Sequence, residues 1–223
     1  MEFFPLREQK GAVMITSSSN QQMKNITALM KKVKERKSQN LFVVEGRKMF
    51  EEVPPEWLSK VYVSERFLEE PEAEQLLAGK IYEVVADAVF KSISDTQTPQ
   101  GILCLVRMPQ YPLSDLLCGD RTHLLIVESI QDPGNLGTML RTGEGAGITG
   151  IIMNRTTVDL FNPKTIRSTM GSIYRVPFFI TKDLAGTISS LKEQQVNVSG
   201  AAQLRPGITR GRGAALQDHA GEP

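Results

Sequence analysis

The pattern of apolar and polar positions near residue 26 predicts an amphipathic helix. Four apolar side chains follow the helical spacing i, i+3, i+4, i+7, namely Ile26, Leu29, Met30 and Val33. Lys and Arg fill most of the remaining positions, so the opposite face is basic. Such a face is usually just solvated. Contact with RNA phosphates is the more specific interpretation, because clustered cations release counterions from a polyanion.

Several short apolar runs in the first half predict strands. They are LFVVEGR at residues 41–47 and the runs at 60–63, 81–85 and 101–107. Helical patterns alternate with these runs, which is typical of an α/β domain. Residues 109–122 then carry two prolines and a Gly-Asp pair, the composition of a linker, so we expect a domain boundary near Met108.

The second half opens with a strand, a tight turn and a helix, followed by a strand at 150–154. HLLIVES at residues 123–129 predicts the first strand. The turn is Asp132-Pro133-Gly134-Asn135, and Asn135 is placed to cap a helix that begins at Leu136. Three residues supply its apolar face: Leu136, Met139 and Leu140.

Arg141 is the candidate ligand-binding residue of that helix, on a face that it shares with Thr138 and Thr142. A guanidinium one and a half turns from the carboxyl edge of a sheet points toward the crevice where open α/β sheets bind ligands. The commoner outcomes for a helical arginine are packing over leucine or pairing with an acid, here Glu144.

GAGITG at residues 145–150 matches the dinucleotide-binding pattern GxGxxG, but in the wrong context. That motif follows a strand and opens a helix, whereas these glycines end a helix and lead into a strand. We therefore interpret them as helix-stop and turn glycines.

A second cationic helix is expected after Asn162. Pro163 suits a first helical turn, and Lys164, Arg167 and Ser168 recur along one side of the helix. Together with Arg141 they would form a concave site suited to a phosphodiester. A helix over 184–194 and a strand over 196–201 complete the expected elements.

Composition narrows the class of protein. The 223 residues are 40% hydrophobic with a net charge of +1, so any signal for nucleic acid is local. Cys104 and Cys118 have neither CxxC spacing nor nearby histidine, which disfavours disulfides and metal sites. The start of the chain lacks the features of a signal peptide and no run is long enough for a membrane helix, so the cytosol is expected.

DPGNLGTMLRTGEGAG, followed by FNPKTIRSTMGS and YRVPF, resembles the first two motifs of the SpoU (TrmH) family of RNA ribose 2'-O-methyltransferases. The resemblance implies an α/β fold of the SPOUT class with a carboxyl-terminal trefoil knot. It also implies S-adenosyl-L-methionine as cofactor and a homodimer. The family pattern falls on Asn135 and Arg141 in the first motif and on Ser168 and Gly171 in the second.

The resemblance extends to the first half, where KxxKxRKSQNLFVVEGRKM is similar to the family's substrate-binding domain. It implies an RNA substrate, with ribosomal RNA the first expectation and transfer RNA the second. We expect RNA contacts from Lys164 and Arg167 and from four residues of the first half: Arg36, Glu45, Gly46 and Arg47. Glu45 alternatively orients an arginine.

A methyltransferase site must stabilise the oxyanion that develops as the ribose 2'-hydroxyl attacks a methyl carbon. Arginine is effectively never deprotonated in proteins, so a role as proton acceptor is excluded. We expect Arg141 to hold phosphate and stabilise the alkoxide, Asn135 to fix the loop and Ser168 to orient Arg141 or the phosphate.

The family's third motif, a Gly-Asn-Glu-Gly loop and a Ser-Leu-Asn segment, has no counterpart after residue 204. LRPGITRGRGAALQDHAGEP is expected instead to be a frameshifted or truncated tail, which leaves the knot incomplete. Weak activity or a non-catalytic RNA-binding remnant is then the alternative to a working enzyme. Ala201 and Ala202 are the expected cofactor contacts.

These expectations divide the chain into five parts. They are an extension over 1–13 with Met14 as a candidate start, an RNA-binding domain over 14–108, a linker over 109–122, a methyltransferase domain over 123–204 and a tail over 205–223.

Overall fold

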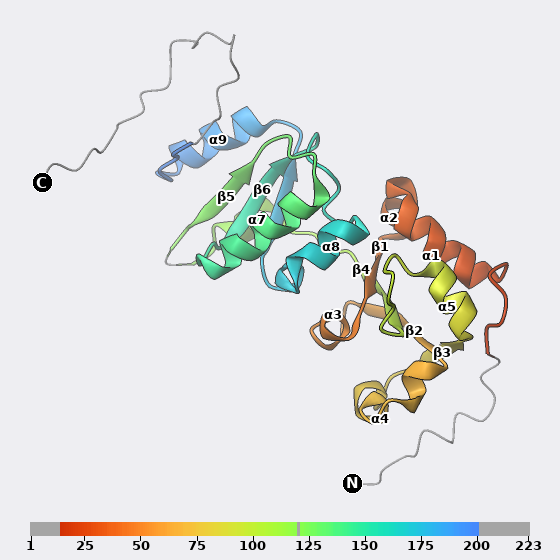
Figure 1. Cartoon of the computed structure of the whole chain (residues 1–223). Coiled ribbons are helices and arrows are strands. Elements are labelled where there is room, and N and C mark those ends of the chain that lie inside the picture. The colour runs from red at the N-terminus through yellow and green to blue at the C-terminus, as the bar shows by residue number, and fades with distance from the viewer. Residues whose placement is uncertain (1–13, 120, 201–223) are drawn as a thin grey trace, which may run out of the picture.

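Two β-sheets, one in each half of the chain, organise the computed structural model, which describes residues 14–119 and 121–200 (Figure 1). The first sheet has the strand order β1-β4-β2-β3, with bounds Leu41–Glu45, Ile102–Arg107, Leu58–Ser64 and Tyr82–Val85. The second has the order β5-β6-β7, with bounds Leu124–Val127, Gly150–Asn154 and Phe178–Thr181. The expected α/β class is confirmed.

Strand β4 forms the core of the first sheet. It pairs antiparallel with β1 and β2, while β2 and β3 are parallel. Its side chains alternate between two apolar layers, as the pleat of a strand requires. Leu103 and Leu105 face α1 (Gln21–Lys31) and α5 (Asp87–Ile93), whereas Cys104 and Val106 face α3 (Arg47–Glu51) and α4 (Ala73–Leu77). A short 3-10 helix, η2 (Arg66–Glu69), follows β2.

The single helix expected from residue 26 is two helices. Lys32 is extended, with φ −121° and ψ 115°, and separates α1 from α2 (Val33–Gln39). The buried stripe of α1 is Met23, Ile26 and Leu29, so the expectation for Val33 is wrong, because Val33 is 39% exposed beyond the break.

The second sheet is parallel, with β6 in the middle. Ile151 and Met153 of β6 pack in one cluster with buried residues of α7 (Pro133–Gly145) and α8 (Pro163–Thr169). Ile152 packs on the other face with residues of α6 (Leu113–Leu116) and α9 (Leu184–Glu193). A 3-10 helix, η3 (Ser172–Tyr174), lies before β7.

Two expectations for this half require correction. Met139 does not belong to the buried face of α7, because its side chain is 37% exposed. Within the expected linker, α6 packs on the second sheet: Leu116 is 1% exposed, and an added Cβ at Gly150 would lie 2.6 Å from its Cγ. The linker itself stays a prediction. Residues 196–200 form no strand. The segments 1–13 and 205–223 lie outside the described residues.

The two halves share one apolar cluster. Phe42 of β1 lies 4.9 Å from Phe161, and Trp57 lies 6.2 Å from Tyr174, measured between ring centroids. The Tyr174 hydroxyl also donates a hydrogen bond of 3.1 Å to the Met49 carbonyl. Over the described ranges, no helix is long and apolar enough to cross a membrane.

Candidate functional site

Helix α7 begins three residues earlier than expected, at Pro133 rather than Leu136. Its N-cap is Asp132, whose Oδ1 accepts a hydrogen bond of 2.8 Å from the Asn135 amide. Asn135 is therefore not the cap but an exposed residue of the first turn. The Asp-Pro dipeptide was the available signal, because Asp is a common N-cap and proline a common first residue. That hydrogen bond, and then Lys164, lower the pKa of Asp132.

Arg141 lies on the exposed surface of α7. Because the helix starts at Pro133, Arg141 is roughly 12 Å along the axis, further from the sheet edge than the sequence suggested. The alternative in which it pairs with Glu144 is wrong, since Glu144 accepts hydrogen bonds from Arg175 and Ser172 instead. The guanidinium of Arg141 is thus exposed and accessible to a ligand.

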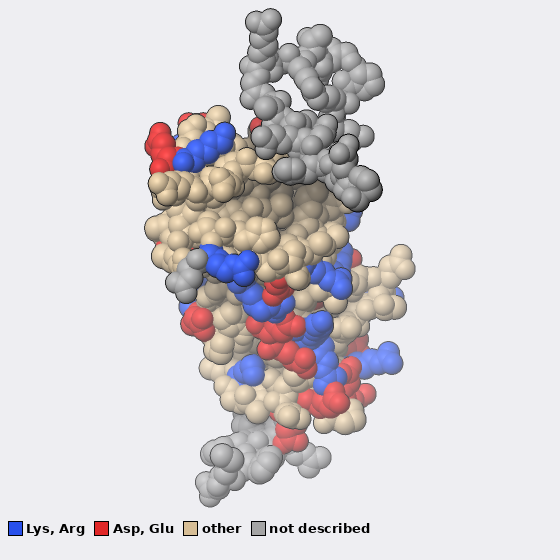
Figure 2. Space-filling model, turned by 90° about the vertical axis from the view of Figure 1, so that its left-hand side faces the viewer, with Lys and Arg blue, Asp and Glu red and all other residues tan. Residues whose placement is uncertain are grey.

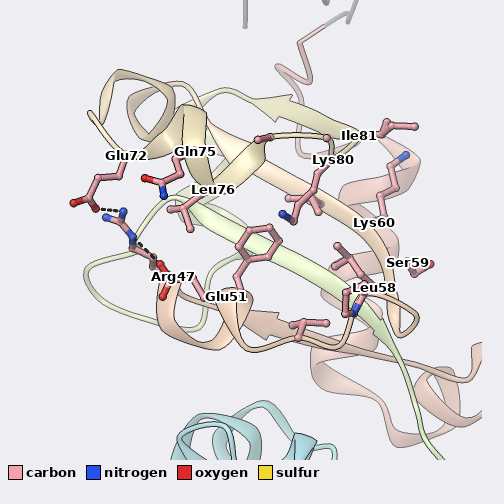
Figure 3. A pocket seen from close by; sticks show the side chains of 16 residues that line it. Arg47, Glu51, Leu58, Ser59, Lys60, Glu72, Gln75, Leu76, Lys80 and Ile81 are labelled. Atoms are coloured by element: carbon pink, nitrogen blue, oxygen red, sulfur yellow. Dashed lines mark hydrogen bonds and ion pairs between the residues drawn. The ribbon is translucent and has the colours of Figure 1, made fainter. Parts of the chain in front are cut away.

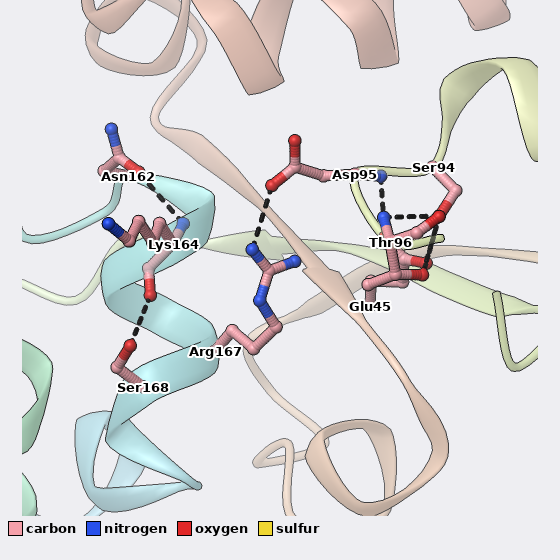
Figure 4. A network of polar contacts seen from close by, with 8 residues as sticks. All are labelled: Glu45, Ser94, Asp95, Thr96, Asn162, Lys164, Arg167 and Ser168. Carbon is pink, nitrogen blue, oxygen red and sulfur yellow. Dashed lines mark hydrogen bonds and ion pairs between the residues drawn. The ribbon is translucent and has the colours of Figure 1, made fainter. Parts of the chain in front are cut away.

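Helix α8 starts as the sequence predicts. Pro163 is in its first turn, and the side chain of Asn162 accepts a hydrogen bond of 2.9 Å from the Lys164 amide. Lys164 reaches α7, with its Nζ 3.3 Å from Asp132. The Ser168 hydroxyl donates a hydrogen bond of 2.8 Å to the Lys164 carbonyl within the helix (Figure 4).

Arg167 leaves α8 in another direction than Lys164 and Ser168 (Figure 4). Its Nη2 lies 3.1 Å from Asp95 of the first half of the chain. The expectation that these three side chains lie along one side of α8 is therefore only partly correct. Lys164 and Ser168 are one turn apart, whereas Arg167 faces the first half of the chain.

Close contact between α7 and α8 depends on Gly137. A Cβ at this position would lie 2.6 Å from both the Ser168 Cβ and the Thr165 carbonyl oxygen. Real Cβ atoms do not approach so closely, so only glycine permits this spacing. The structure thus brings the helix of Asn135 and Arg141 against the helix of Ser168. It shows no direct contact of Ser168 with Arg141 among the described residues.

A second ion-pair network, missed from the sequence, ties α7 to the first half. Arg175 lies between Glu144 of α7 and Glu52, and donates hydrogen bonds to both. These two hydrogen bonds raise the pKa of Arg175. The bonds from Arg175 and Ser172 lower the pKa of Glu144. Gly171, at φ 95°, allows the turn beside Glu52.

Arg36, expected to contact RNA, is instead buried, with 1% of its surface exposed. Its Nε and Nη2 donate to Asp159 Oδ2 at 2.8 and 2.6 Å. Its Nη1 donates to the carbonyls of Leu29 and Met30, at the end of α1. Because every nitrogen of the guanidinium has a protein acceptor, we assign Arg36 a structural role between the two halves.

The other candidates of the first half have different surroundings. Glu45 accepts hydrogen bonds from residues 94–96, and within the part of the chain that the structure describes no hydrogen bond or ion pair joins it to an arginine. Gly46, at φ 101°, is the N-cap of α3. Arg47 donates toward three carboxylates that offset its charge: Glu51, Glu70 and Glu72. In the face shown in Figure 2, cations are likewise interspersed with acids and form no continuous basic patch.

A groove of about 920 Å³ lies beside α3, α4 and β2 (Figure 3). Lys80 lies over the Phe50 ring within it, 5.6 Å from the ring centroid. Its lining residues all fall between Arg47 and Ile81. The groove therefore belongs to the first sheet and is not part of the α7–α8 site.

Polar side chains gather at the carboxyl edge of the parallel sheet. Ser129, which follows β5, hydrogen bonds to Asn154 at the end of β6 and to Thr156 just beyond it. The two cofactor candidates, Ala201 and Ala202, lie outside the described residues. Within residues 14–119 and 121–200, no group of three or more His, Cys, Asp or Glu side chains is arranged to hold a metal ion.

Comparison with known proteins covers both halves. An MRM3-like substrate binding domain matches residues 20–104, and the SpoU rRNA Methylase family matches residues 122–212. The 23S rRNA (guanosine(2553)-2'-O)-methyltransferase RlmP of Bacillus subtilis is 33% identical over 190 residues, which cover 84% of this chain and 73% of that protein. The chain belongs to the SpoU rRNA methylase family.

Other members of the SpoU family are similar in sequence and structure. Human mitochondrial rRNA methyltransferase 3 is 29% identical over 166 residues, covering 71% of this chain and 39% of that protein. The AdoMet-bound rRNA methyltransferase from Sinorhizobium meliloti is 28% identical with a TM-score of 0.69, covering 82% of this chain and 68% of that one. The likeness thus includes both halves of the chain.

Proposed function

We propose that this SpoU-family protein transfers a methyl group from S-adenosylmethionine to a ribose 2'-hydroxyl of large-subunit ribosomal RNA. The Bacillus relative is named for that reaction on 23S rRNA, and the Sinorhizobium neighbour is an AdoMet-bound rRNA methyltransferase. One observation carries the proposal. Arg141 is exposed on α7, and α7 itself packs directly against α8, which carries Lys164 and Arg167. We further propose that the enzyme acts in the cytosol as a homodimer, as the family resemblance implies.

The cofactor, when bound, supplies an electrophilic methyl group, and the residues of this chain act on the RNA. The 2'-oxygen must lose its proton to solvent as it attacks, so negative charge develops on it. Arg141 holds the adjoining phosphate and stabilises that charge as a hydrogen-bond donor. Lys164 provides a second cation on the neighbouring helix, where Asp132 holds it.

Asn135 and Ser168 have supporting roles in this proposal. Asn135 lies in the exposed first turn of α7 and fixes the preceding loop through the hydrogen bond that its backbone amide donates to Asp132 Oδ1. Ser168 lies where α8 meets α7 and orients the phosphate on the Lys164 side.

Methyl transfer to RNA tests the proposal. Tritiated S-adenosylmethionine would be supplied with transcripts of 23S rRNA, 16S rRNA and transfer RNA, and we expect label in the first. Arg141→Ala should lower turnover on the order of 100-fold or more, with RNA affinity only modestly weakened. Arg66→Ala, which removes an exposed arginine of the first half, is the matched control.

Two results would contradict the proposal. An Arg141→Ala protein with normal turnover would eliminate the assigned role. RNA binding without any methyl transfer, together with no heat of binding for S-adenosylmethionine by calorimetry, would favour a non-catalytic RNA-binding protein instead.

A further inference from the structure

The carboxylate of Glu45, the last residue of β1, organises the 94–96 segment that follows α5. Its Oε1 accepts hydrogen bonds from the hydroxyls of Ser94 and Thr96, the latter at 2.8 Å. Its Oε2 accepts one of 3.2 Å from the Asp95 amide (Figure 4). Both oxygens are thus used inside the protein, and a carboxylate would in any case repel an RNA phosphate. A direct contact between Glu45 and RNA is disfavoured on both grounds.

The segment held by Glu45 presents Asp95 to helix α8. Asp95 Oδ2 accepts from Arg167 Nη2 at 3.1 Å, and both side chains are about half exposed, at 52% and 44%. An ion pair this exposed contributes little to the stability of the fold. Its effect here is to hold the Arg167 guanidinium in one orientation. Among the described residues, Nη2 is the only guanidinium nitrogen of Arg167 that donates a hydrogen bond to the protein. The other guanidinium donors remain available to a ligand.

We propose that Glu45 is a positioning residue for RNA binding, acting through the 94–96 segment and Asp95 on Arg167. This inference rests on the proposed function, because it takes an RNA phosphate as the ligand of Arg167. An arginine fork discriminates by geometry, so a guanidinium already fixed by Asp95 loses less conformational freedom when phosphate binds. Glu45 lies at the far end of this chain of contacts and never touches the RNA.

A double-mutant cycle tests this coupling. The probe is a fluorescein-labelled transcript of the 23S rRNA segment around the guanosine for which the Bacillus relative is named, and affinity is measured by anisotropy. Arg167→Ala should weaken binding by about threefold to tenfold. It should also reduce the slope of log K against log salt by about 0.7 to 0.9, the loss of one phosphate contact.

Glu45→Gln keeps the shape of the side chain but replaces one acceptor oxygen with a donor amide. We expect it to weaken binding, though less than Arg167→Ala, and to have no further effect in the Arg167→Ala background. Glu83→Gln is the matched control, a similarly half-buried glutamate of the same sheet that pairs with Lys60 and not with the 94–96 segment. Its affinity should equal that of the wild type.

The outcomes separate this inference from the proposed function. Additive effects of Glu45→Gln and Arg167→Ala would overturn the positioning role while leaving the methyltransferase proposal intact. So would an Arg167→Ala protein with unchanged affinity and salt slope. A wild-type protein that fails to bind the transcript would instead contradict ribosomal RNA as the substrate, and the positioning role with it. Melting temperatures of the variants exclude a simple loss of folding.

Discussion

Replacing Arg36 with alanine should destabilise the protein by about 3 kcal/mol. The side chain of Arg36 is 2% exposed and that of Asp159 is 15% exposed, so the substitution leaves a largely buried carboxylate without its partner. Removal of one member of a buried pair costs about 3 to 5 kcal/mol, and the partial exposure of Asp159 favours the lower end. The carbonyls of Leu29 and Met30 lose a donor in the same step. Such a loss is a large fraction of the roughly 5 to 15 kcal/mol of a typical domain.

Urea unfolding followed by fluorescence measures this loss. Trp57 is the only tryptophan in the sequence, and it packs against Tyr174 of the other half, so its emission reports on the contact that Arg36 helps to hold. Lys37→Ala is the matched control, because Lys37 is the next residue of α2, carries the same charge and is exposed. We expect the control to change stability by no more than about 0.5 kcal/mol.

Arg36→Lys distinguishes charge from geometry. An ammonium keeps the charge but cannot donate to Asp159 and to the end of α1 in the fixed arrangement of a guanidinium. We expect an intermediate loss of about 1 to 2 kcal/mol. An Arg36→Ala protein that unfolds at the same urea concentration as Lys37→Ala would refute the structural role assigned to Arg36.

Two further predictions concern α7. The pKa of Glu144 is lowered by Arg175, so its stabilising effect is complete above its ordinary value of 4.5 and is lost as pH falls through the lower folded value. Glu144→Gln should therefore be less stable than the wild type at pH 7, and this difference in urea midpoint should shrink on acidification to about pH 3; a constant difference would contradict the assignment. Gly137→Ala should cost about 1 to 3 kcal/mol because its Cβ would collide with Ser168, whereas Gly145→Ala, with open space around it, should be neutral or slightly stabilising. Equal unfolding midpoints for the two alanine variants would show that α7 and α8 adjust freely.

The sequence was sufficient where the determinants are local. The strands at 124–127 and 150–154 follow from apolar runs, and α8 from the Asn162-Pro163 start. At the start of α7 the local signal was present but was assigned to Asn135 instead of Asp132. Ion pairs between residues that are distant in the chain have no such local signal in the sequence.

Arg36 shows why partners that are distant in the chain cannot be predicted from the sequence. Arg36 lies in a lysine-rich helical segment, and that pattern indicated contact with RNA. The break at Lys32, however, leaves the carbonyls of Leu29 and Met30 without their helical donors, and the Arg36 guanidinium supplies them. Asp159, which completes the set of acceptors, is 123 residues away. Only the folded arrangement reveals that this cation is buried.

The contacts between the two halves converge on one segment of the SpoU domain. Among the described residues, three charged side chains of the first half reach it: Arg36 contacts Asp159, Asp95 contacts Arg167 and Glu52 contacts Arg175. All three partners fall between residues 159 and 175, which contain α8 and its flanks.

A substitution in the first half can therefore weaken RNA binding by displacing α8, without removing any contact to RNA. Loss of affinity in such a variant does not by itself identify an RNA-binding residue. Substitution of a cation that touches an RNA phosphate should lower the salt dependence of binding in any background. Substitution of a residue that acts through α8 should no longer change the affinity once the α8 cation that it positions has been removed.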